Sequence, residues 1–111
     1  MADYQKLVEN KKWKKLARLG KSKKLAVVDE VAAACGSAKS EEAHNILVDI
    51  LSRPEREAQL AAVKGLGSLR HDIGSQITRL IWLKDRIDES DTELAETIDK
   101  ALSQLHEAKA R

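Results

Sequence analysis

The chain has 111 residues, of which 42% are hydrophobic and 34% charged, and its formal net charge is +2. A chain of this length forms one domain with a buried core, and the composition excludes an intrinsically disordered protein. Because Phe is absent and only three residues are aromatic, we expect Leu, Ile, Val and Ala side chains to fill the core.

The first 24 residues are strongly basic, with nine Lys or Arg residues against two acidic ones. We expect a short first helix, a turn near Asn10, and a second helix that starts near Lys11 and places Trp13 and Leu16 on one face. Three interpretations stay open for the bases: a solvated surface, phosphate binding as in nucleic-acid recognition, and steering of an acidic protein partner. Binding to a membrane surface is a weaker fourth, because the apolar face is short, and no membrane partner is expected. The candidate anion-binding residues are Lys11, Lys12, Lys14, Lys15 and Arg18.

The next helix is expected to bury Val27, Val31 and Cys35, with Gly36 at its end or at a close approach between helices. Cys35 is the only cysteine, which excludes an internal disulfide and favours the reducing cytoplasm. A reactive thiolate needs an accessible, electropositive setting, so we interpret Cys35 as a buried structural thiol rather than a nucleophile.

Residues 40–53 predict an amphipathic helix, and the helix after it is expected to begin with a capping box from Ser52 to Glu55. Small and apolar residues recur along this second helix at steps of three and four: Ala58, Ala61, Ala62, Gly65, Leu66 and Leu69. Its "GLGSLR" segment lacks the third glycine and the preceding strand of a phosphate-binding loop. We therefore interpret the segment as a helix-packing motif.

Two more helices are expected, over residues 72–87 and 90–108, and the second is expected to open with a capping box from Ser90. The first has an apolar stripe that consists of Ile73, Ile77, Leu80, Ile81 and Ile87. Trp82 lies off this stripe. Its position fits either an exposed surface for self-association or burial under the last helix.

A shift of thirty-one residues brings much of the chain into register with itself. Leu16 then falls on Leu47, and Gly36 falls on Gly67, with a serine after each glycine. A helical hairpin cannot bury its apolar face alone, so we interpret the recurrence as a stack of similar hairpins. The alternative is a chance alignment of similar amphipathic helices. The register fails in the last helix, as is common in terminal repeats.

The segment "PEREAQLAAVKGLGSL" resembles the second helix of a HEAT repeat, with its Ala-rich body and Leu-Gly-x-Leu ending. The resemblance implies an all-α fold, a right-handed α-α superhelix or short solenoid of about three helical hairpins. Residues 1–111 would form one domain, with approximate units 3–37, 38–69 and 70–108. Where the family often has a Val-Arg pair, this chain has Ala58-Gln59, so the usual polar contacts between repeats are not expected.

No catalytic constellation is found in the sequence. His44, His71 and His106 have no spacing that places two of them on one helical face, and there is no paired-cysteine zinc motif. We therefore expect a non-enzyme without cofactor or metal. No apolar run is long enough to span a membrane, and no signal peptide is recognised.

The leading hypothesis is a small non-catalytic scaffold that mediates protein-protein interaction, and the alternative is a nucleic-acid or phosphate-binding module. HEAT-like second helices line an inner surface that holds a protein partner. Four polar residues interrupt the apolar stripes of those helices and are the candidate partner-binding residues: Asp29, Arg56, Gln59 and Lys64. Self-association through an end of the stack also stays open.

Overall fold

The computed structural model describes residues 3–111, which form seven α-helices and no β-strand. The expectation of an all-α fold is thereby confirmed. The helices are α1 (Tyr4–Glu9), α2 (Trp13–Leu19), α3 (Leu25–Gly36), α4 (Glu41–Leu51), α5 (Arg56–Ser68), α6 (Ile73–Lys84) and α7 (Thr92–Ala110). None of them, within the part of the chain that the structure describes, is long and apolar enough to cross a membrane.

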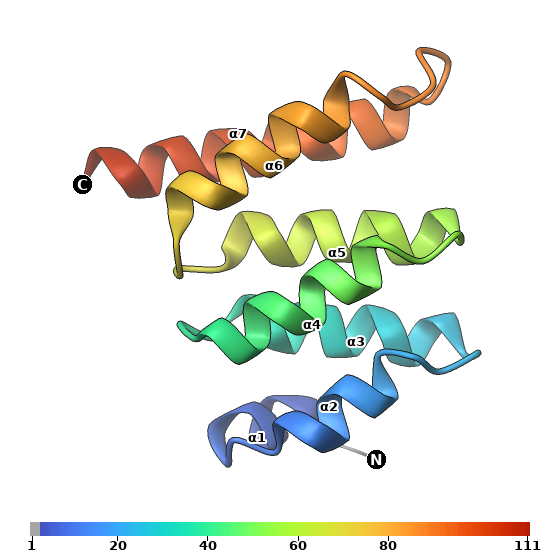
Figure 1. Ribbon diagram of the computed structural model, residues 1–111, viewed down its shortest axis with the longest axis vertical. Helices are drawn as coiled ribbons and strands as arrows, with labels where there is room; N and C mark the ends of the chain where they lie inside the picture. The colour runs from blue at the N-terminus through green and yellow to red at the C-terminus, as the bar shows by residue number, and fades with distance from the viewer. Residues whose placement is uncertain (1–2) are drawn as a thin grey trace.

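The helices form two layers. Helices α3, α5 and α7 lie side by side as the back layer, and α2, α4 and α6 lie over them as the front layer (Figure 1). The molecule measures 36 × 34 × 19 Å, and the short dimension matches two layers of helices about 10 Å thick. Helix α1 packs against α2 and α3 at the N-terminal end.

The turn between α1 and α2 confirms the expected break near Asn10. The Asp3 carboxylate caps α1 by accepting a hydrogen bond from the Lys6 amide. At the other end, the amides of Asn10, Lys11 and Lys12 all donate back to carbonyls of α1. Lys11 follows in the left-handed region, with φ of 55°. Leu16 on α2 is fully buried, and Trp13 packs partly buried against the core.

The back layer is held together at glycines. A Cβ atom on Gly36 would lie 2.9 Å from the carbonyl oxygen of Gly65 and 3.0 Å from its Cα, both backbone atoms. A Cβ atom on Gly67 would lie 2.8 Å from the Cβ of Ala101 on α7. The helix-packing interpretation of "GLGSLR" is therefore confirmed, because the backbones of α3, α5 and α7 approach too closely for larger residues.

The front layer is less closely packed. Helices α2 and α4 contact each other, but no Cα atom of α4 lies within 8 Å of a Cα atom of α6. The facing residues on these two helices are larger than those of the back layer, and include Leu51, Arg79 and Leu83. A groove therefore separates α4 from α6.

The structure corrects three expectations about local structure. Ser52 caps the C-terminus of α4 and Glu55 makes no side-chain capping bond, so the expected capping box is wrong. At α7 the cap is Asp91, which accepts from the Leu94 amide, rather than Ser90. Ile81 is 49% exposed, although the expected stripe of α6 included it.

The glycine contacts predict opposite effects of the same substitution at different sites. Gly36→Ala and Gly67→Ala should each lower the free energy of unfolding by about 1–3 kcal/mol, because the new methyl group forces two helices apart. Gly74→Ala should raise it by up to about 1 kcal/mol, because nothing lies within 4 Å of a Cβ there and alanine favours helix. Urea unfolding followed by circular dichroism measures all three. Equal effects at Gly36 and Gly74 would contradict the close approach.

Candidate functional site

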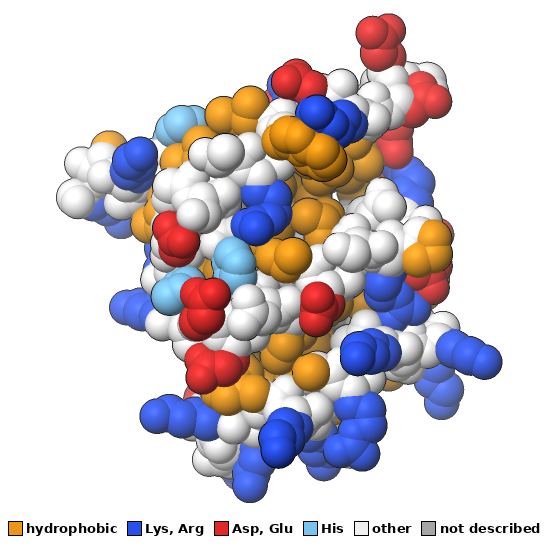
Figure 2. All heavy atoms as spheres, in the orientation of Figure 1, with side chains coloured by type: hydrophobic (Ala, Val, Ile, Leu, Met, Phe, Trp, Pro, Cys, Tyr) orange, Lys and Arg blue, Asp and Glu red, His pale blue; other side chains and the backbone are white. Residues whose placement is uncertain are grey.

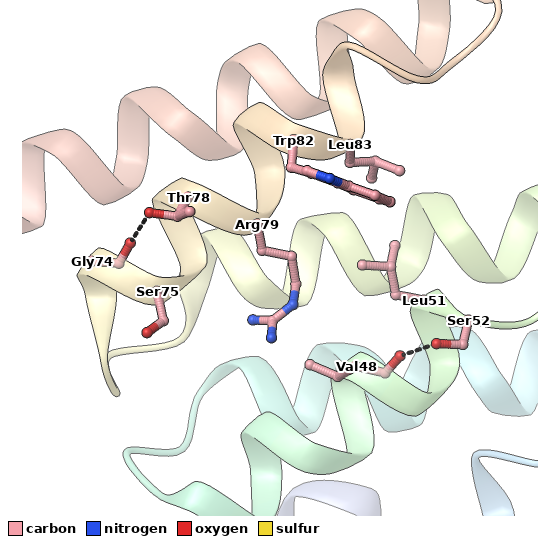
Figure 3. Close-up of a pocket in the computed structure, with 9 residues that line it drawn as sticks. All are labelled: Val48, Leu51, Ser52, Gly74, Ser75, Thr78, Arg79, Trp82 and Leu83. Atoms are coloured by element: carbon pink, nitrogen blue, oxygen red, sulfur yellow. Dashed lines mark hydrogen bonds between the residues drawn. The ribbon is translucent and has the colours of Figure 1, made fainter.

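A groove of about 740 Å³ lies between α4 and α6 and is open to solvent (Figure 3). Helix α4 contributes one wall and α6 the other, and hydrophobic side chains are exposed along the hollow (Figure 2). The lining residues are Val48, Leu51, Ser52, Gly74, Ser75, Thr78, Arg79, Trp82 and Leu83. The groove therefore has an apolar part and a polar part.

Trp82 dominates the apolar part. Its residue surface is 55% exposed, which is unusual for so large a hydrophobic residue. Leu51 is directed from α4 toward the indole ring (Figure 3), and Arg86 covers the ring with its guanidinium carbon 3.8 Å from the ring centroid. The sequence left open whether Trp82 is buried under the last helix, and the structure places it in the groove instead.

The hydroxyl groups of the polar part are already bonded within the chain. Ser52 donates to the Val48 carbonyl, Thr78 to the Gly74 carbonyl, and Ser75 to the Asp72 carboxylate. Each of these hydroxyls therefore already donates its single proton.

Arg79 is the one charged residue of the lining, and its side chain is directed from α6 toward α4 (Figure 3). Its guanidinium donates one hydrogen bond, 3.1 Å long, to the Gln76 side-chain oxygen. Among residues 3–111 it has no carboxylate partner.

Gln76 is fully buried and joins Arg79 to α4. Because arginine can only donate, the Gln76 oxygen accepts, and its Nε2 donates to the His71 carbonyl (3.2 Å) and to His44 Nδ1 (2.6 Å). His44 Nδ1 is therefore unprotonated in this arrangement. Desolvation, and next the positive charge of Arg79, hold the pKa of His44 below its usual value.

A second contact links the same two regions of the chain. The His71 ring nitrogen Nε2 lies 2.5 Å from a Glu41 carboxylate oxygen, at the start of α4. The rings of His44 and His71 meet edge to face, with centroids 6.2 Å apart. These polar contacts connect the N-terminal ends of α4 and α6, although the two helices are separated along the groove.

The four candidate partner-binding residues lie on the back layer, away from the groove. Asp29 on α3 and Lys64 on α5 are exposed. Gln59 donates to the Arg53 carbonyl at the turn after α4. Arg56 pairs with Asp91 and Glu93 at the start of α7, at 2.8 and 2.7 Å. Two of the four candidates are thus engaged in contacts within the chain.

The candidate anion-binding residues belong to α2 and the turn before it, at the N-terminal end of the molecule, where Lys and Arg side chains gather (Figure 2). All five are exposed, and in the described part of the chain none makes an ion pair. They lie on the turn after α1 and on α2, and are Lys11, Lys12, Lys14, Lys15 and Arg18. The structure therefore presents them together to solvent.

Cys35 is fully buried, and burial raises the pKa of its thiol to about 12. The interpretation of Cys35 as a buried thiol is confirmed. Over residues 3–111, no group of three or more His, Cys, Asp or Glu side chains is arranged to hold a metal ion.

Sequence reasoning did not identify the groove residues Val48, Leu51, Arg79 and Leu83 as a site. Of the groove residues, only Trp82 could be recognised from the sequence as unusual, because it lies off the apolar stripe of its helix. The others have the spacing of ordinary core or surface positions, and only the separation of α4 from α6 brings them into one groove.

Comparison with protein-family models, curated protein sequences and solved structures finds no match for this chain. The groove and the surface charges are thus the basis for a functional proposal.

The lowered pKa of His44 predicts a pH dependence of stability. As the pH falls through about 6.5, the unfolded chain takes up a proton on His44 before the folded chain does, so the folded state loses stability. His44→Asn keeps an acceptor for Gln76 and removes the titrating group, so this variant should lose less stability between pH 7 and pH 5. Urea midpoints of both proteins at the two pH values measure the difference, and equal losses would contradict the assignment.

Proposed function

We propose that this chain is a small non-catalytic α-helical-repeat scaffold that binds a protein partner. The proposed architecture is a short right-handed solenoid of HEAT-like hairpins, in which α4–α5 and α6–α7 are successive units. The recurrence over thirty-one residues and the two-layer packing support it. The cytoplasm is the proposed location.

The main observation in favour of a protein-binding function is the exposure of Trp82 at the α4–α6 groove. Aromatic residues are enriched in protein-protein interfaces, and tryptophan is among the residues that contribute most to binding energy. Leu51 and Leu83 extend the apolar surface beside it, and both are partly buried already. A segment of a partner that packs against Trp82 would remove more apolar surface from water without unfolding either helix.

Selection from a display library of random peptides tests the proposal. Peptides of about 16 residues, which can form four helical turns, are selected on the immobilised chain and then synthesised. Trp82→Ala should weaken their binding at least about 30-fold, equivalent to about 2 kcal/mol. Fluorescence anisotropy of labelled peptides gives the dissociation constants.

Ile81→Ala is the matched control, because Ile81 is the neighbouring exposed hydrophobic residue on α6 and does not line the groove. It should change binding less than about twofold, which is within the effect of a neutral contact. Melting curves establish that both variants fold. Recovery of no peptide, or equal binding to the Trp82→Ala variant, would overturn the groove as a protein-binding site.

The exposed bases of α2 and the preceding turn favour a second candidate function, binding to a nucleic acid through its phosphate groups. Lys11, Lys12, Lys14, Lys15 and Arg18 share one end of the molecule and have no acidic neighbour within ion-pair distance in the described chain. Neutralising several phosphates releases counterions, so such binding falls steeply as salt is added. Nothing in the sequence, or in the structure of residues 3–111, resembles a base-reading element, so binding would be independent of nucleotide sequence.

Titration of a labelled mixed-sequence oligonucleotide with the chain tests this second candidate. Binding should persist at about 0.15 M salt, and Lys14→Glu with Lys15→Glu should weaken it at least about tenfold. The control variant combines Lys64→Glu with Lys100→Glu, which reverse the charge of two exposed lysines of α5 and α7. It should retain most of the affinity for the oligonucleotide. Absence of binding at about 0.15 M salt, or equal losses of affinity in both variants, would exclude the candidate.

A further inference from the structure

The α4–α6 groove contains one cation and no anion. Of its nine lining residues, Arg79 alone is charged, and the hydroxyls of Ser52, Ser75 and Thr78 already donate within the chain. The Arg79 guanidinium has five N–H donors. Only its Nη1 group donates a hydrogen bond within residues 3–111, to the Gln76 side-chain oxygen. The hydroxyl oxygens can still accept, and the hydrogen-bond donors that stay free in the groove are those of the positively charged Arg79.

The guanidinium is also held in place. Gln76 is fully buried and is bonded on its nitrogen side to both His44 and the His71 backbone, so its oxygen has a fixed position. Arg79 is itself only partly exposed, on the same helix as Trp82 and one turn before it. A partner that bonds to Arg79 would thus lose little affinity to the ordering of this side chain.

A second arginine increases the positive charge near Trp82. Arg86 lies one turn after Trp82, stacks on its ring, and donates to the Trp82 carbonyl at 3.1 Å. Like Arg79, it forms no ion pair with any residue from 3 to 111. An exposed aromatic ring is therefore flanked by two arginines without carboxylate partners.

We infer that the groove binds an acidic, amphipathic segment of a protein partner. One Asp or Glu carboxylate of the segment pairs with Arg79, and an apolar side chain one helical turn away packs against Trp82 and Leu51. This inference rests on the proposed scaffold function and names the chemistry of its partner. Arginine forms two parallel hydrogen bonds with a carboxylate, and once the bound segment displaces water from the groove this pair gives specificity as well as attraction.

The length of the groove fits a helical segment better than a small molecule. Its α6 wall runs from Gly74 to Leu83, nine residue steps that span about 13 Å of helix. An occupant of the same length has between two and three helical turns, enough to place an acidic and an apolar residue on one face. The groove is open along its length, whereas small-molecule sites enclose most of the ligand surface.

A double-mutant cycle tests the pairing with Arg79. The probes are the peptides selected on the chain, each synthesised in two forms, with its acidic residue present or replaced by the matching amide. Arg79→Gln should weaken binding of the acidic form at least about tenfold, and of the amide form less than about twofold, because only the first loses a charge pair. Arg79→Lys keeps the charge but not the planar fork, so the acidic form should bind it with intermediate affinity.

Arg111→Gln is the matched control, because Arg111 is an exposed arginine that lies outside both the groove and the basic surface of α2. It should leave both forms of the peptide unaffected, and thermal melting establishes that each variant folds. Equal losses for the acidic and amide forms on Arg79→Gln would overturn the pairing. Peptides that need Trp82 but contain no acidic residue would overturn this inference and leave the scaffold function intact.

The remaining outcomes concern other occupants. If selection recovers no peptide, the scaffold function and this inference both fail. Sedimentation velocity at the concentrations of the peptide titrations detects self-association. A dimer that Trp82→Ala dissolves would place a second copy of the chain in the groove and overturn the inference, whereas a monomer supports it.

Discussion

The close approach of α3, α5 and α7 sets the spacing of the other helices. Gly36 meets the backbone of Gly65, and Gly67 meets Ala101, so the back layer packs almost backbone to backbone. The facing side chains of α4 and α6 in the front layer are larger, so these two helices cannot approach each other as closely as the helices of the back layer do. The groove between them is thus a consequence of small residues on the opposite layer of the molecule.

The buried side-chain amide of Gln76 fixes the position of α6 relative to α4, although the two helices are separated along the groove. A buried polar group without partners costs about 1–3 kcal/mol, and the bonds of Gln76 to His44, His71 and Arg79 offset that cost. They connect the helix ends while the groove stays open beyond them. The same bonds orient a guanidinium into the groove, so one polar contact serves both the fold and the proposed recognition.

The candidate site was only partly predictable from the sequence, and particular residues show why. Trp82 stood out because helical periodicity reveals a large apolar residue that lies off the buried face. Arg56 was selected by the same periodicity as a partner-facing residue, yet it pairs with Asp91, thirty-five residues later in the chain. Periodicity along one helix contains no information on which distant residue lies opposite.

The all-helical fold, the break between the first two helices, the burial of Cys35 and the packing role of Gly36 and Gly67 could all be predicted from the amino-acid sequence. These follow from local periodicity and from the absence of a side chain, which are properties of neighbouring residues. Three features depend on how the helices pack and could not be predicted: the exposure of Ile81, the contact of Gln76 with His44, and the separation of α4 from α6. The physical reason is that the distance between two helices depends on every side chain packed between them, across both layers.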